Sequence, residues 1–125
     1  MSDRVDIAGV PFSTARRVGN LYFVSGQVPI DMATGLTVEG SLTAQLSQVM
    51  TNLARAVESV GAALSDVVKT TVYMTDIGDL AEMNAEYRAH FAPGRYPART
   101  TVEVSALARP EWLIEIEAVV SVGRN

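Results

Sequence analysis

The chain has 125 residues, of which 48% are hydrophobic and 19% are charged, and it contains no cysteine. This length fits one folded domain, and the lack of cysteine excludes a disulfide framework, a thiol nucleophile and a thiolate metal site. The net charge of −4, with the basic residues scattered along the chain, disfavours a nucleic-acid partner.

No segment of the sequence is suited to cross a membrane or to direct secretion. There is no apolar run of about 18 residues and no cationic start followed by an apolar block. We therefore expect a cytoplasmic protein without a membrane partner. We also expect a single domain over residues 1–125, with residues 1–9 as a loosely held lead-in.

The first predicted elements form a β-hairpin. Gly19 and Asn20 give a turn signal, and the aromatic and β-branched run at residues 21–24 follows as a strand. Residues 27–35 are predicted to form a loop, because proline and glycine interrupt strand pairing there. Gly26, just before this loop, permits a close backbone approach, either by a ligand or by another strand.

Residues 41–60 form the clearest predicted helix. Apolar residues recur there at steps of three and four, so one stripe of the helix should pack on a sheet, with Met50 in the core. Ser41 suits the start of this helix, and Gly61 suits the left-handed residue that closes it. The opposite side is predicted to carry the polar residues Gln45, Gln48, Asn52, Arg55 and Ser59.

A strand and a second helix follow. Residues 66–74 are rich in β-branched side chains and predict a strand. Residues 79–91 predict a helix that begins with Asp79 and Glu82 in a capping-box-like pattern. Proline and glycine at residues 92–97 then end the helix.

Two strands near the end of the chain alternate between apolar and polar residues. In the first, Val102 shares one face with Val104 and Ala106, and Arg99 lies on the other. In the second, at residues 113–122, Glu115 and Glu117 alternate with apolar residues. If both apolar faces pack under the helices, Arg99 and the two glutamates share the opposite sheet face. Such charges form either a surface salt-bridge ladder or a lined cleft, and the period alone does not decide.

The element order predicts an α+β fold with two helices on one face of a β-sheet. The uncovered face of the sheet would need a partner, which favours a homo-oligomer.

Four blocks of the sequence closely resemble the signature blocks of the RidA/YjgF family: VSGQVP at 24–29, DVVKTTVYM at 66–74, PARTTVEV at 97–104 and IEIEA at 114–118. The resemblance runs in order over about residues 11–122. It implies a chorismate-mutase-like fold with a mixed β-sheet, and a homotrimer with ligand clefts between neighbouring subunits. In members with the arginine, it also implies hydrolysis of reactive 2-imino or enamine acids to 2-oxo acids and ammonia, without a metal or a cofactor.

The same resemblance implies roles for single residues. Arg99 resembles the arginine that holds the substrate carboxylate, and a planar, permanently charged guanidinium suits that task. Glu115 resembles the residue that orients the attacking water, which a carboxylate can do within hydrogen-bond reach. Ser25 and Gly26 resemble residues next to the ligand, whereas Glu117 is assigned an inter-strand ion pair as its simplest role.

Three departures from the family pattern concern the substrate pocket. Phe12 stands where members commonly have tyrosine, so the ring is kept but its hydrogen-bond donor is lost. Thr101 stands where many members have cysteine, and Trp112 lies in a loop about one residue longer than usual. We include Phe12 and Thr101 among the substrate-binding residues, and we expect the departures to affect substrate choice more than reaction class.

The predicted function is therefore a deaminase of the 2-iminobutanoate/2-iminopropanoate type, acting on a small imino acid through Arg99 and Glu115. The alternatives are a deaminase for another enamine, such as an aminomuconate, and a non-catalytic trimer that binds oxo acids. A chorismate-mutase-like isomerase has no support from the motifs, and the acidic balance weighs against RNA cleavage. His90, the single histidine, supports neither a nucleophilic triad nor a zinc site, and we expect it on the surface or near a helix end.

Overall fold

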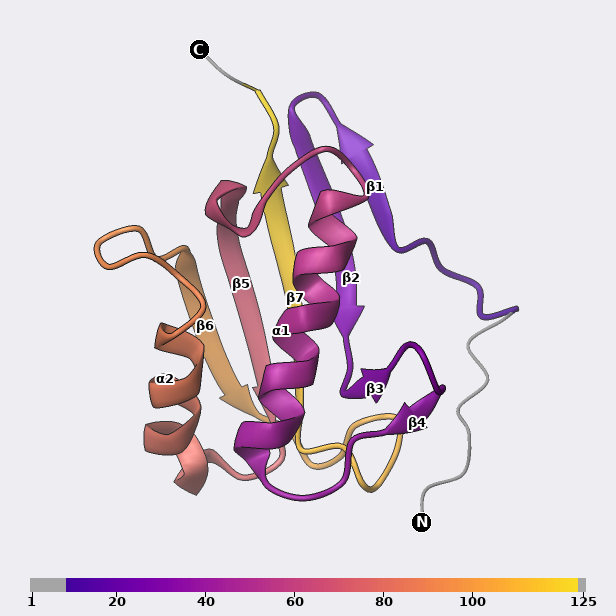
Figure 1. Cartoon of the computed structure of the whole chain (residues 1–125), viewed down its shortest axis with the longest axis vertical. Coiled ribbons are helices and arrows are strands. Elements are labelled where there is room, and N and C mark those ends of the chain that lie inside the picture. The colour runs from indigo at the N-terminus through magenta and orange to yellow at the C-terminus, as the bar shows by residue number, and fades with distance from the viewer. Residues whose placement is uncertain (1–8, 124–125) are drawn as a thin grey trace.

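The computed structural model describes residues 9–123, so most of the expected lead-in at residues 1–9 lies outside the described part. Figure 1 shows the path of the chain, whose elements in order are β1 Ala15–Val18, β2 Leu21–Gln27, β3 Ile30–Asp31, β4 Leu36–Thr37, α1 Leu42–Glu58, a 3₁₀ turn at Leu64–Asp66, β5 Val67–Met74, a second 3₁₀ turn at Ile77–Asp79, α2 Leu80–Arg88, β6 Ala98–Glu103 and β7 Ile114–Ser121.

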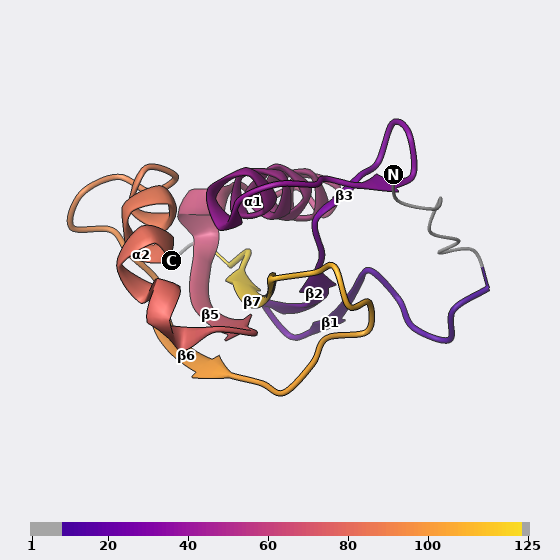
Figure 2. The ribbon, with the colours of Figure 1, turned by 90° about the horizontal axis from the view of Figure 1, so that it is seen from below.

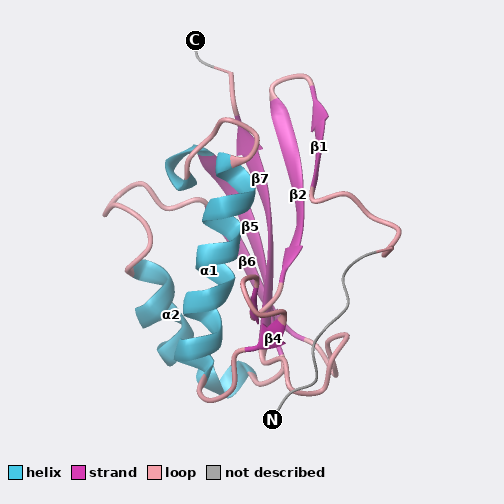
Figure 3. Ribbon diagram, turned by 45° about the vertical axis from the view of Figure 1, so that its right-hand side comes forward, coloured by secondary structure: helices cyan, strands magenta, loops and turns pink. Residues whose placement is uncertain are grey.

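The main sheet has five strands in the order β1-β2-β7-β5-β6. Strands β5 and β6 are parallel, and the other neighbours are antiparallel, so the predicted mixed sheet is confirmed. Figures 2 and 3 show α1 and α2 on one face of this sheet, with the other face uncovered. The predicted loop at residues 27–35 contains β3, which pairs with β4 in a separate two-stranded sheet.

Helix α1 fills the centre of the core, as its apolar stripe predicts. Leu46, Val49, Leu53 and Val57 are fully buried, and Met50 is buried with them. The predicted ends are confirmed within two residues. Ser41 is the N-cap, and its hydroxyl oxygen accepts a hydrogen bond from the Ala44 amide at 3.2 Å. Gly61 follows the helix with a φ of +81°, a conformation that favours glycine.

The prediction that Gln45 and Asn52 lie on the outer side of α1 was wrong, because both are buried. Gln45 donates hydrogen bonds to the carbonyl oxygens of Val38 and Glu111 at 3.1 and 2.9 Å, and its own oxygen accepts from the Leu113 amide at 2.8 Å. Asn52 donates to two further carbonyl oxygens, both at 2.9 Å. Loops fold over α1 at these points, and their backbone groups need polar partners.

Helix α2 begins without the predicted capping box. The Asp79 side chain makes no capping hydrogen bond. Glu82 instead accepts hydrogen bonds from the backbone amide and the hydroxyl of Thr43 on α1, at 3.0 and 2.7 Å. The carboxylate expected to start α2 therefore joins the two helices. Met83 and Tyr87 are the buried residues of α2.

Strand β6 turns the opposite face to the helices from the one predicted. Thr70, which is fully buried, pairs with Arg99 across the parallel ladder, so both side chains point towards α2. Val102, expected under the helices, is 38% exposed. Glu115 pairs with Tyr73 and alternates with the buried residues of β7, so it faces the uncovered side. The prediction that Arg99 shares a sheet face with Glu115 and Glu117 was therefore wrong.

The reversed orientation of β6 follows from its position at the edge of the sheet. A central strand such as β7 must turn its apolar residues towards the helices, and its alternation identifies the buried face. An edge strand beside a short helix can place long polar side chains against that helix.

No helix among residues 9–123 is both long enough and apolar enough to span a membrane.

Candidate functional site

Arg99 is held against helix α2 by two contacts that leave its charge uncompensated. Its guanidinium carbon lies 4.9 Å from the centre of the Tyr87 ring, a cation–π contact, and its Nη1 lies 3.8 Å from the sulfur of Met83. The Tyr87 hydroxyl is fixed in turn by Thr70, at 2.7 Å between the two oxygens. Within residues 9–123, no carboxylate pairs with Arg99. The guanidinium is thus positioned by neutral groups and keeps its capacity to bind an anion.

Two buried polar atoms near Arg99 have no hydrogen-bond partner among the described residues. They are Oδ1 of Asn84, on α2, and Oγ1 of Thr101, two residues after Arg99 on the same face of β6. Buried polar atoms without partners are uncommon in folded proteins, and a bound ligand is one explanation for them. Asn84 lines a cavity of about 280 Å³ together with Arg99. We call Asn84, Tyr87, Arg99 and Thr101 the arginine site.

Asn84 and Tyr87 were missed in the sequence as site residues. Both lie within the predicted helix at residues 79–91. Their place next to Arg99 depends on how α2 lies over β6, which the pattern within the helix does not report.

The Glu115 carboxylate lies directly against the backbone of Gly26. A Cβ atom added at Gly26 would overlap that carboxylate, so only glycine fits this position without a rearrangement. The close approach permitted by Gly26 is thus made by a side chain of β7.

The surroundings of Glu115 also alter its protonation. Burial raises the pKa of Glu115, and the negative charge of Glu117 raises it further. A carboxylate with a raised pKa is a better proton acceptor, because catalytic efficiency improves as the pKa approaches the working pH.

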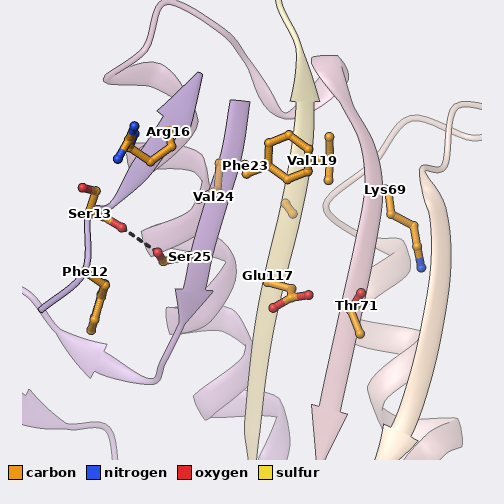
Figure 4. A pocket seen from close by; sticks show the side chains of 11 residues that line it. Phe12, Ser13, Arg16, Phe23, Val24, Ser25, Lys69, Thr71, Glu117 and Val119 are labelled. Carbon is orange, nitrogen blue, oxygen red and sulfur yellow. Dashed lines mark hydrogen bonds between the residues drawn. The ribbon is translucent and has the colours of Figure 1, made fainter. Parts of the chain in front are cut away.

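Two further predicted site residues lie near Gly26. Ser25 is on β2, and Phe12 is on the segment before β1. The Ser25 hydroxyl donates a hydrogen bond to the carbonyl oxygen of Ser13 at 2.5 Å. Figure 4 shows a cavity of about 350 Å³ that is lined by Phe12, Ser25 and Glu117. Glu117 projects into this cavity between Ser25 and Thr71 of β5, whereas Glu115 does not line it. We call Phe12, Ser25, Gly26 and Glu115 the glutamate site.

Phe12 separates two hollows of the surface. Its side chain is 64% exposed and lines both the cavity in Figure 4 and a second one of about 390 Å³, next to Gly26, Val28 and Met32. Its ring therefore forms a shared wall. A change at this position alters the shape of both hollows without disturbing the core.

The predicted site residues thus form two separate groups in one chain. The glutamate site lies around β2 and β7 and the arginine site lies on β6, with β5 between β6 and β7. Arg99 faces the helices, and Glu115 faces the uncovered side of the sheet. One chain by itself does not bring Arg99 and Glu115 to the same ligand.

The remaining polar residues offer few alternatives. His90 pairs with Glu86 one turn earlier, at 2.8 Å between Nε2 and Oε2. Among residues 9–123, the histidine, aspartate and glutamate side chains form no group of three or more that could hold a metal ion.

Comparison with known proteins gives matches over nearly the whole chain. The family described as Endoribonuclease L-PSP matches residues 3–122. A RutC family protein of Pyrococcus abyssi is 47% identical over 109 residues, which are 87% of this chain and 84% of that protein. The protein named 2-iminobutanoate/2-iminopropanoate deaminase of Salmonella typhimurium is 39% identical over 111 residues, or 87% and 85% of the two chains. The crystal structure of RidA from an Antarctic Psychrobacter species superposes with a TM-score of 0.86 at 36% identity, covering 98% of this chain and 97% of the other.

Proposed function

Because the chain belongs to the RidA/YjgF family and has its chorismate-mutase-like fold, we propose that it hydrolyses reactive 2-imino acids to 2-oxo acids and ammonia. The relative named as a 2-iminobutanoate/2-iminopropanoate deaminase supports this reaction class. The observation that carries the proposal is the Arg99 guanidinium. Within residues 9–123 it has no carboxylate partner, and the Asn84 and Thr101 atoms near it have no hydrogen-bond partner.

Arg99 binds the substrate carboxylate in this proposal. A guanidinium presents parallel N–H donors that match the two oxygens of a carboxylate, and its charge is permanent. The Tyr87 ring keeps the guanidinium in place without neutralising it. Asn84 and Thr101 each offer a buried polar atom to the rest of the ligand.

Glu115 accepts a proton from the water that attacks the iminium carbon. The water oxygen forms a bond to that carbon, the C=N π electrons move to nitrogen, and the released proton passes to the carboxylate. Glu115 then returns the proton to nitrogen. The C–N bond breaks as ammonia leaves, and the hydroxyl proton is lost to form the 2-oxo acid. One water is consumed, and nitrogen departs as ammonium once it has taken up that proton.

We further propose a cytoplasmic homotrimer in which the arginine site of one subunit faces the glutamate site of the next. A ring of identical subunits brings two different surfaces of the chain together at every interface. The uncovered sheet face supports this arrangement, because it exposes Phe23 by 49% and Val102 by 38%. The ligand cleft would then lie between subunits.

Binding of oxo acids without hydrolysis is the second candidate, and Phe12 is the observation that favours it. A phenyl ring cannot donate a hydrogen bond to substrate or water, so a catalytic contact could be missing. Both functions use Arg99, but only hydrolysis uses Glu115 as a base.

The test is a coupled assay for ammonia release from imines generated freshly by an amino-acid oxidase. Charge-assisted hydrogen bonds contribute about 1.5–3 kcal/mol, so we expect Arg99→Lys to lower kcat/KM by about 10- to 100-fold. Arg99→Ala should lower kcat/KM at least as much. Arg95→Ala, which removes an exposed arginine elsewhere, serves as the control.

Size-exclusion chromatography of each variant shows whether the assembly is intact. Unchanged turnover by Arg99→Ala would refute the role of Arg99. Oxo-acid binding that depends on Arg99, with no ammonia release by the natural chain, would favour the second candidate.

A further inference from the structure

A second arginine, Arg88, lines the same cavity of about 280 Å³ as Arg99. The other lining residues are Asn84, Tyr87, Tyr96 and Pro97, so none of them is acidic. The chain as a whole has a net charge of −4, with 14 acidic residues against 10 basic ones. Two guanidinium groups in one cavity without an acid therefore form a positive site in a negative protein.

The acidic residues of α2 are engaged elsewhere. Glu82 accepts two hydrogen bonds from Thr43 on α1. Glu86 pairs with His90 at 2.8 Å. Over the described part of the chain, Arg88 takes part in no ion pair within 4.0 Å. Arg88 is exposed, and no carboxylate of residues 9–123 neutralises its charge or that of Arg99.

Arg88 also lies one helical turn after Asn84, so the two side chains project from the same side of α2. Oδ1 of Asn84 is buried and has no partner among residues 9–123. A basic residue in the last turn of a helix stabilises the helix dipole by about 0.3–1 kcal/mol, which accounts for an arginine at this position. It does not account for the cavity that Arg88 shares with Arg99.

We propose that the substrate carries a second carboxylate, which Arg88 binds while Arg99 binds the carboxylate next to the imine. The protein then acts on imines of acidic, dicarboxylic amino acids. This inference rests on the proposed function and names the substrate class of the same site. It assigns Arg88 as the residue that determines specificity.

The experiment compares three proteins, the natural chain, Arg88→Ala and Arg95→Ala, on imines generated from aspartate, glutamate and alanine. The two arginine variants change the net charge equally, but Arg95 lines a different cavity, next to His90 and Phe91. We expect Arg88→Ala to lower kcat/KM for the two dicarboxylic imines about ten-fold more than for the alanine imine. Arg95→Ala should not discriminate between the three substrates.

Binding of stable 2-oxo acids separates this inference from the proposed reaction. Calorimetry should show that the natural chain prefers 2-oxoglutarate to 2-oxobutanoate, and that Arg88→Ala removes the preference. This result without ammonia release would overturn the deaminase proposal and support the second carboxylate site. Equal effects of Arg88→Ala on both ligand classes, or no effect on either, would overturn the role of Arg88.

Discussion

Glu115 takes its chemical character from two neighbours, the backbone of Gly26 and the carboxylate of Glu117. Gly26 leaves room for the carboxylate to lie against the β2 backbone, where burial raises its pKa. Glu117, two residues along the same strand, raises that pKa further by charge repulsion. Tyr73, opposite Glu115 on β5, also has a raised pKa, through burial and then the charge of Glu117.

We expect Glu117→Gln to shift the acid limb of the pH profile of kcat/KM to lower pH. Glu115 must be ionised to accept a proton, so the limb reports its pKa, which lies above the ordinary value of 4.5 in the natural chain. Removing the negative charge of Glu117 makes ionisation of Glu115 easier and lowers that pKa. The profile is measured with an imine whose own pKa lies outside the range.

Glu103→Gln is the control for this shift, because Glu103 also carries a carboxylate but lies on β6, where it accepts a hydrogen bond from the Ile77 amide. It should leave the limb in place. An unmoved limb in Glu117→Gln, or a shift to higher pH, would contradict the role of Glu115 as the base.

We expect Phe12 to influence which sizes of substrate the protein accepts. Phe12→Tyr adds one hydroxyl to the wall shared by two cavities, and one hydrogen bond changes a free energy by about 0.5–1.5 kcal/mol. We therefore expect the ratio of kcat/KM between bulky and small imino acids to change by about two- to ten-fold. Phe23→Tyr adds the same group elsewhere in the cavity of Figure 4, so comparing the two variants shows whether the effect is particular to position 12. Identical substrate profiles for Phe12→Tyr and the natural chain would argue against this role.

At the scale of elements, α1 is a scaffold for the loops as well as the centre of the core. Gln45 joins residues before α1 to the loop that leads into β7, through hydrogen bonds with Val38, Glu111 and Leu113. The same loop is held by Trp112, whose indole N–H donates to the Thr37 hydroxyl at 3.1 Å. Because β7 carries Glu115, these contacts fix the strand that presents the proposed base.

We expect Gln45→Ala to lower the free energy of unfolding by about 3 kcal/mol, because it leaves buried backbone groups without partners. Gln48→Ala is the control on the same helix and should cost below about 1 kcal/mol. Among the described residues, the Gln48 side chain hydrogen-bonds only that of Asn52, at 2.8 Å. Urea unfolding is measured at one fixed protein concentration, because assembly would shift the apparent stability. Equal losses in both variants would show that the loop contacts of Gln45 add nothing.

The sequence predicted those elements whose pattern is set by burial within the element itself. The stripe of α1, its Ser41 cap and the alternation of β7 all record which side faces the core. The buried positions of Gln45 and Asn52 were not predictable in this way, because their partners are carbonyl groups of loops distant in sequence. The predicted buried face of β6 was wrong for a related reason. The polar side of β6 faces α2, and only the register with β5 reveals it.

The candidate site was predictable in its residues but not in its layout. Arg99, Glu115, Ser25 and Gly26 could be named from the resemblance of short blocks, whereas their distribution over two sheet faces depends on strand order. Asn84 was identified from its buried oxygen, which has no partner among residues 9–123, and from the cavity that it lines with Arg99.

In the whole molecule, the arginine site and the glutamate site lie apart, and we propose that they are two halves of one ligand site. Arg99 lies on the edge strand and faces the helices, while Glu115 lies two strands away and faces the uncovered side. Oligomerisation through the uncovered face would bury its exposed apolar residues and bring unlike halves together. In the proposed assembly, one ligand is bound by two subunits.

Mixing two inactive variants tests this claim most directly. Arg99→Ala and Glu115→Ala are unfolded together in equal amounts, refolded and assayed for ammonia release against each variant refolded alone. If every cleft takes Arg99 from one subunit and Glu115 from its neighbour, random assembly restores about one quarter of the natural clefts. We expect the mixture to regain activity of that order, while each variant alone stays inactive. A mixture no more active than the separate variants would contradict a ligand site shared between subunits.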